Sequence, residues 1–168
     1  MTITVPTTVT ASSPTSLPAD SVDGHHRVVV GMDDDAASVA ALRFAAREAA
    51  YRGGDVLAIN VWHYPYTWGL PTVWPEEANP SGYIMSQLQQ IVDDTLTERT
   101  AAGEPVVPIT VEVVEGDAAT VLNSAARGVA LLVLGARHHN RLLGSVSQAC
   151  TNHPPCPVVV VPAAPRPT

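Results

Sequence analysis

The stretch that decides the fold is 130-ALLVLGARHHNRLLGSVSQACTNHPPCPVVVV-161. Its first five residues are all apolar, which suits a buried strand, and Gly135 follows where that strand ends. A polar loop leads to Gly144 and Ser145, which predict the start of a helix that runs to about residue 152. The prolines beyond it end the helix, because proline has no amide hydrogen to donate. The closing run of valines predicts a second buried strand.

The order of strand, glycine loop and helix start is an arrangement that holds phosphate groups. Free backbone amides at a helix N-terminus point toward the anion, and the helix dipole favours its negative charge. Gly144 and Ser145 stand where such amides would be. A tight turn that needs glycine for backbone reasons alone explains the same pattern equally well. Both interpretations stay open at this point.

The stretch resembles the C-terminal signature of the universal stress protein family, which is G-x2-G-x9-G-[ST], a helix, a Pro-Cys-Pro sequence and a valine-rich strand. Residues 142–147 (LLGSVS) and 155–161 (PCPVVVV) are close matches. The loop departs from the signature, because Gly144 comes nine positions after Gly135 instead of thirteen, and His138 replaces the second glycine. Four residues span about 13 Å of extended chain, so this loop cannot cradle a triphosphate as the family loop does.

A second match to the same family lies near the N-terminus. The family opens with V-V-V-G-x-D-G-S, and the corresponding residues here are 28-VVVGMDDD-35. The resemblance implies that Asp33 contacts a nucleoside and that Val61, near the end of the second strand, meets adenine through its backbone. A role in the turn and in capping the next helix explains Asp33 equally well, because aspartate is common at such positions.

The remaining sequence alternates between strand and helix patterns. We expect strands over 27–31, 55–62, 108–114, 130–134 and 158–161, and helices over about 35–52, 86–102, 118–128 and 145–152. In the first helix we expect Asp35 as the N-terminal cap, Gly53 as a left-handed C-terminal cap and Val39 in the apolar stripe. This alternation predicts an α/β fold with an open doubly wound sheet. The resemblance, which covers residues 27–161, implies five parallel strands in the order 3-2-1-4-5, the adenine nucleotide alpha hydrolase-like fold of universal stress proteins. Asp33 and Gly135 would then emerge together at the switch point of the sheet.

We expect a single folded domain with short tails. A flexible N-terminal tail covers residues 1–26, the universal-stress-type α/β domain covers 27–162, and a C-terminal tail covers 163–168. The N-terminal tail is rich in Thr, Ser, Pro and Ala and buries too little apolar surface to offset its ordering entropy. An aromatic, proline-rich loop over 63–82 suits a lid, a partner-binding surface or a cover for an apolar patch.

Composition excludes several classes of function. The net charge of −7 argues against binding to nucleic acid or to an anionic membrane surface. All nine basic residues are arginines, so the chain has neither a Walker-type phosphate loop nor a Schiff-base lysine. The sequence shows no secretory signal and no apolar span of membrane-helix length, which predicts a cytoplasmic protein. We interpret Cys150 and Cys156 as small core residues and expect no metal site.

The resemblance implies a cytoplasmic homodimer that binds ATP or AMP, with Mg²⁺ only beside ATP, and that regulates a stress response through an unknown protein client. Gly135, Arg137, Gly144 and Ser145 would hold the phosphates, and the last strand, Pro157 to Val161, would pair with its copy in a second subunit. No catalytic residues stand out in the sequence, so any ATP hydrolysis would be slow or absent.

Two alternatives stay open. The first is a dimeric interaction module of the same fold that has lost ATP binding and works through the aromatic loop. The shortened glycine loop and its missing second glycine favour this alternative. The second is an electron-transfer flavoprotein-like function, which rests on analogy of fold alone.

Overall fold

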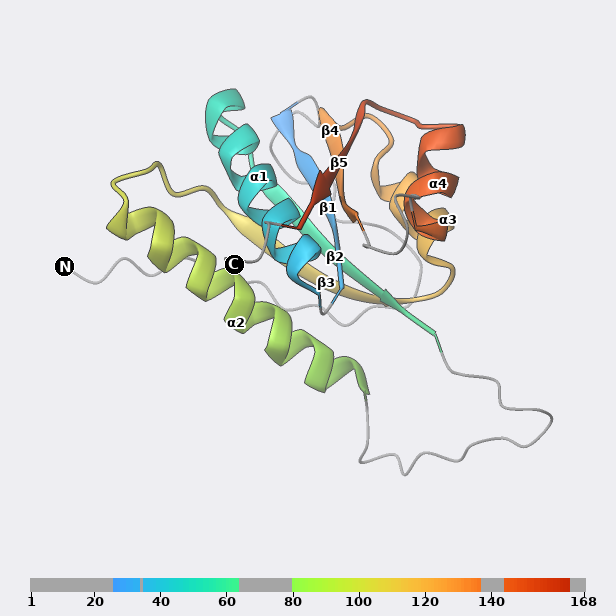
Figure 1. Cartoon of the computed structure of the whole chain (residues 1–168), viewed down its shortest axis with the longest axis horizontal. Helices are drawn as coiled ribbons and strands as arrows, with labels where there is room; N and C mark the ends of the chain where they lie inside the picture. Colours follow the sequence, from blue (N-terminus) through green and yellow to red (C-terminus); the bar gives the residue numbers. More distant parts are fainter. Residues whose placement is uncertain (1–25, 34, 64–79, 137–143, 164–168) are drawn as a thin grey trace, which may run out of the picture.

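Five parallel strands form one sheet in the computed structural model, which describes residues 26–33, 35–63, 80–136 and 144–163 (Figure 1). The strand order is β3-β2-β1-β4-β5, so the predicted α/β fold and strand order are confirmed. The strands are β1 (Val28–Met32), β2 (Val56–Trp62), β3 (Ile109–Glu115), β4 (Leu131–Ala136) and β5 (Val158–Pro162). The helices are α1 (Ala36–Arg52), α2 (Pro80–Ala101), α3 (Ala118–Ala125) and α4 (Ser145–Asn152).

The helices cover the sheet in two pairs, and the central strand is therefore buried on both faces. α1 and α2 pack on one face, and α3 and α4 pack on the other (Figure 1). Val28, Val29 and Val30 of β1 have no exposed surface, and their side chains alternate between the two apolar clusters. This double burial is why the central strands are continuous apolar runs in the sequence.

α1 begins and ends with the capping residues that the sequence predicted. The Asp35 carboxylate accepts a hydrogen bond from the Ser38 amide at 2.7 Å, and Gly53 adopts the left-handed conformation with a φ of 65°. Val39 was predicted to lie in the buried stripe, but it is only partly buried. The residues of α1 that are buried are Ala37, Ser38, Ala41, Leu42, Ala45, Ala46 and Ala49. All of them except Leu42 have small side chains, which allow α1 to lie close to the sheet.

α2 begins earlier than the sequence periodicity predicted. We expected a loop over 63–82 and a helix from residue 86, whereas the helix begins at Pro80. Proline is compatible with the first turn of a helix, because the amide hydrogen that it lacks has no partner there. The rest of the predicted loop, residues 64–79, lies outside the described residues. Of the described helices, none has both the length and the hydropathy needed to span a membrane.

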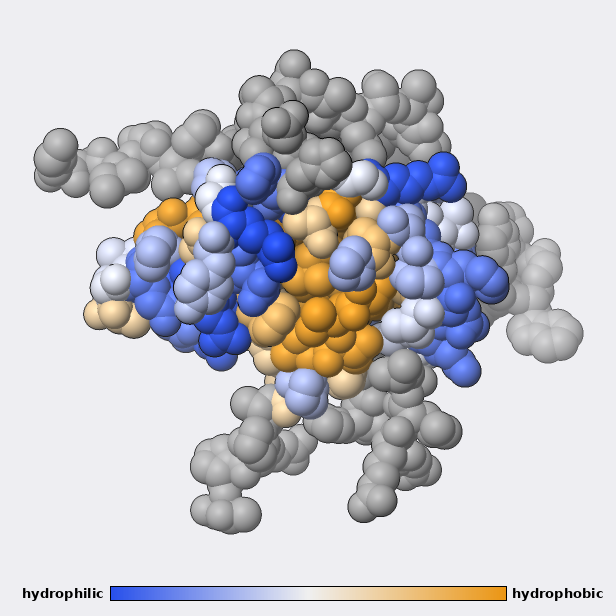
Figure 2. All heavy atoms as spheres, turned by 90° about the horizontal axis from the view of Figure 1, so that it is seen from above, coloured by the Kyte–Doolittle hydropathy of each residue, from blue (hydrophilic) through white to orange (hydrophobic). Residues whose placement is uncertain are grey.

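β5 forms one edge of the sheet and carries half-buried valines. Val158–Val161 are all partly exposed, and no described strand pairs with their outer edge. In Figure 1 this strand lies between α1 and α4. Figure 2 shows an apolar area on the face seen from above, with hydrophilic surface on both sides. The sheet therefore has an apolar margin between its two helical layers.

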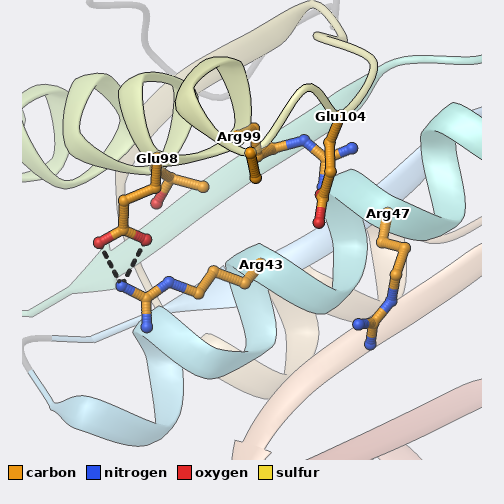
Figure 3. A pocket seen from close by; sticks show the side chains of 7 residues that line it. Arg43, Arg47, Glu98, Arg99 and Glu104 are labelled. Carbon is orange, nitrogen blue, oxygen red and sulfur yellow. Dashed lines mark hydrogen bonds and ion pairs between the residues drawn. The ribbon is translucent and has the colours of Figure 1, made fainter.

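A pocket of about 290 Å³ lies between α1 and α2 and is lined by charged side chains (Figure 3). Arg43 of α1 forms an ion pair with Glu98 of α2 at 2.7 Å, and both side chains are about half exposed. Arg99 is only 7% exposed and pairs with Glu104 at 2.8 Å. Its Nε and Nη2 also donate to the carbonyl oxygen of Pro105. Arg99 therefore ties the end of α2 to the segment that leads into β3.

We expect Arg99→Met to lower the free energy of unfolding by about 1–3 kcal/mol, because it leaves the Pro105 carbonyl without its donor. Arg43→Met is the matched control. It removes an exposed ion pair and should cost less than about 1 kcal/mol. Urea unfolding followed by circular dichroism measures both changes. Equal losses of unfolding free energy would show that burial does not decide how much these contacts contribute to stability.

Candidate functional site

Asp33 and Val61, which were predicted to contact the nucleoside, lie at the carboxyl-terminal edge of the sheet together with Gly135, which was predicted to hold phosphates. Asp33 directly follows β1, and Val61 and Gly135 are each the last residue but one of β2 and β4. β1 lies between β2 and β4, so the carboxyl ends of three neighbouring strands meet here. The strand order reverses at this position, which is where open α/β sheets bind ligands.

Side chains from three elements hold the turn between β1 and α1. The Asp33 amide donates to the Ser38 hydroxyl at 2.9 Å. The Asn60 side-chain amide of β2 donates to the Met32 carbonyl oxygen at 3.0 Å. Asp35 provides the helix cap through its bond to the Ser38 amide. The N-cap of α1 is therefore Asp35 and not Asp33, while a role for Asp33 in the turn stays open.

Gly135 allows a close approach between β4 and α1. A Cβ atom at this position would lie 2.8 Å from the carbonyl carbon of Ala37 and 2.9 Å from the amide nitrogen of Ser38. Real Cβ atoms do not come this close to a backbone, so any side chain here would overlap the first turn of α1. Packing alone is thus a sufficient reason for glycine at this position, whether or not a ligand binds.

The first turn of α4 contacts the end of β4. Gly144 is its N-cap, with an extended backbone (φ −60°, ψ 159°), and no described side chain caps the helix. Ser147 is buried, and its hydroxyl donates to the Gly135 carbonyl at 3.4 Å. Ser145 is the first helical residue and is exposed. The helix start predicted to receive phosphates thus lies beside the end of β4.

Five of the six predicted binding residues are described, and all five belong to this edge or to the start of α4. The sixth, Arg137, lies outside the described residues, as does the remainder of the segment 137–143. The role of each residue in binding stays a prediction.

Three polar residues at this edge were not predicted: Ser38, Asn60 and Ser147. Asn60 is the one polar residue in the β2 sequence VLAINVW, and Ser38 lies on the buried face of α1 among alanines. A polar side chain inside an apolar run is the signal that could have found them, because buried polar groups need partners.

The two cysteines near α4 are buried in different degrees. Cys150 has no exposed surface, and Cys156 is partly buried with its Sγ donating to the Pro157 carbonyl at 3.4 Å. Burial, joined at Cys150 by the charge of Asp117, raises the pKa of both thiols. A raised pKa favours the neutral thiol over the thiolate that binds metals. Within the described ranges, no three His, Cys, Asp or Glu side chains are grouped to hold a metal ion.

The sequence is similar to proteins of one family. The model of the universal stress protein family matches residues 24–162. Universal stress protein Rv1996 of Mycobacterium tuberculosis H37Rv is 31% identical over 157 residues, a match that covers 83% of this chain and 49% of that protein. Universal stress protein Rv2623 of the same strain is 32% identical over 145 residues, covering 80% and 46%. The chain spans about half the length of these curated relatives.

Solved structures share the fold at lower identity. A universal stress protein family member from Burkholderia pseudomallei has a TM-score of 0.60 at 24% identity, covering 85% of this chain and 100% of that chain. A universal stress protein in complex with cAMP has a TM-score of 0.59 at 22% identity, covering 83% and 98%. The Archaeoglobus fulgidus protein in complex with dAMP has a TM-score of 0.51 at 20% identity, covering 80% and 96%.

We expect Gly135→Ala to lower the free energy of unfolding by about 1–3 kcal/mol, because the added Cβ overlaps the backbone of α1. Gly82→Ala in α2 is the control, since a Cβ there meets no atom within 4 Å. Alanine is also the better helix former, so the control should be neutral or more stable by up to about 1 kcal/mol. Urea unfolding compares the two, and wild-type stability in Gly135→Ala would show that β4 and α1 separate without cost.

Proposed function

Because the chain belongs to the universal stress protein family, we propose that it binds an adenine nucleotide, ATP or AMP, and acts as a stress-response regulator without strong catalysis. The observation that carries the proposal is the placement of Asp33, Val61 and Gly135 at one sheet edge, with the start of α4 bonded to Gly135 through Ser147. Two proteins of similar fold form complexes with cAMP and dAMP, which supports an adenine nucleotide as the class of ligand.

In the proposed complex, different residues hold the two ends of the nucleotide. Asp33 contacts the nucleoside, and the backbone of Val61 meets adenine. The phosphates lie at the start of α4, where the amides after Gly144 and at Ser145 suit an anion. No described side chain competes for these amides. Arg137 adds a charged contact to the phosphates, and Mg²⁺ accompanies them only in the ATP complex.

The second candidate is a dimeric interaction module of the same fold that has lost nucleotide binding. The observation in its favour is the loop between Gly135 and Gly144, which is four residues shorter than the family signature. The two candidates differ in a single measurable property, the affinity of the purified chain for adenine nucleotides.

We also propose that β5 joins two copies of the chain. An unpaired strand edge is a template for another strand, and the half-buried valines of β5 supply an apolar margin beside it. The Pro157 carbonyl accepts from the Leu132 amide of β4. Because successive residues of a strand direct their backbone groups to opposite sides, the amides of Val158 and Val160 face the outer edge. These amides would pair with the partner's last strand.

Calorimetric titration should show that ATP and AMP bind with a dissociation constant below about 100 μM, which corresponds to a binding free energy of about −5.5 kcal/mol or more favourable. Gly144→Val should remove most of the affinity for ATP, because a branched side chain at the N-cap blocks the approach to the α4 amides. Its affinity for adenosine, which has no phosphate, should change little. The φ of −60° at this position is one that valine adopts, so the loss of stability should not exceed the roughly 1 kcal/mol typical of a poor N-cap residue. If neither nucleotide binds the wild type, the interaction module is the better candidate.

Light scattering at micromolar concentration should give the mass of two chains. Val160→Pro should give one chain, because proline removes an outward amide while leaving the β4 ladder intact. Val160→Ala keeps the amide and should remain dimeric. A monomeric wild type would contradict the dimer.

A further inference from the structure

The peptide group between Met32 and Asp33 is held at both of its polar ends by side chains. Its carbonyl oxygen, on Met32, accepts from Asn60 Nδ2 at 3.0 Å. Its amide, on Asp33, donates to Ser38 Oγ at 2.9 Å. Asn60 belongs to β2 and Ser38 to α1, so two separate elements fix one peptide plane at the end of β1.

Holding this peptide has a cost elsewhere in the structure. With its amide nitrogen turned to Met32, Asn60 leaves its Oδ1 buried and without a hydrogen-bond partner. Ser38 is 3% exposed and occupies the helix face that packs on the sheet. An apolar side chain could fill the space at either position, and at position 60 it would leave no unpaired oxygen. An unsatisfied buried group of this kind requires a specific reason.

The bonded peptide directly precedes the residue expected to contact the nucleoside. Rotation of the Met32–Asp33 peptide plane changes the direction of the Asp33 Cα–Cβ bond, because the plane ends at the Asp33 Cα. A plane held at both ends therefore limits the positions that the Asp33 side chain can reach. Pre-organised contacts bind more tightly, because less conformational freedom is lost on binding.

We infer that Asn60 and Ser38 are positioning residues that aim Asp33 at the nucleoside of the bound nucleotide. Neither side chain needs to touch the ligand, and both act through the Met32–Asp33 peptide. This inference rests on the nucleotide-binding function proposed above. It assigns an effect on affinity to two residues, the partly buried Asn60 of β2 and the buried Ser38 of α1.

A double-mutant cycle on the full chain tests the inference, with AMP as the titrant in calorimetry. Asn60→Leu keeps the branching and the number of side-chain heavy atoms and removes both the donor and the unpaired oxygen. It should weaken AMP binding about tenfold, which corresponds to 1.4 kcal/mol. Asp33→Ala should weaken binding at least as much. The variant with both changes should bind as weakly as Asp33→Ala alone, because Asn60 acts through Asp33.

Ser38→Ala provides a second cycle with Asp33→Ala, and it decides the matter if Asn60→Leu fails to fold. The control is Thr95→Val, which removes another buried hydroxyl, bonded to the Ile91 carbonyl within α2. This control should leave the AMP affinity unchanged, even if the protein unfolds more easily.

The outcomes separate this inference from the proposed function. If the wild type binds neither AMP nor ATP, both are wrong. If the wild type binds but Asn60→Leu and Ser38→Ala bind equally well, the positioning role is wrong and nucleotide binding stands. The positioning role is also wrong if, in the double variants, the fold-loss of AMP affinity from Asn60→Leu or Ser38→Ala multiplies with the fold-loss from Asp33→Ala. Such independence is expected of a purely structural effect.

Discussion

The burial of β1 on both faces constrains the structure around it. Because apolar layers cover the strand, each of its backbone polar groups needs a partner from β2, β4 or a side chain. The ladder supplies partners along the strand, where Val28 to Met32 are in register with Val56 to Asn60. At the end of β1 side chains add to these contacts, through Asn60 at the Met32 carbonyl and Ser38 at the Asp33 amide. The candidate site therefore begins where the ladder of the buried strand ends.

Most of the fold could be predicted because its signals are local. Apolar runs mark the central strands, and Asp35 and Gly53 mark the ends of α1 by their own chemistry. The strand order came from the family resemblance, and the structure confirms it. The start of α2 was missed because Pro80 suits a loop and the first turn of a helix equally well. Periodicity also misplaced Val39, since the contact of α1 with the sheet is set by the close approach of small residues.

The candidate site was less predictable, because its geometry depends on contacts between distant elements. The sequence left two explanations for the glycine at 135, and its distance to the Ala37 backbone shows that packing requires it. Nothing near Asn60 in the sequence indicates Met32, since the contact exists only after α1 has crossed between β1 and β2. The resemblance supplied Asp33 and Val61, and the structure adds the side chains that surround the turn before α1.

The position of β1 between β2 and β4 also sets the order in which the sheet can be completed. β1 meets β2 within about thirty residues of chain, but its other partner, β4, is synthesised about a hundred residues later. Until then the nascent chain has an open strand edge at the centre of its future sheet, next to an apolar face that α4 has not yet covered. Distant parallel pairings form slowly, and exposed edges of this kind favour aggregation. We therefore expect chaperone binding and misassembly to compete with the folding of this chain chiefly before β4 has been synthesised.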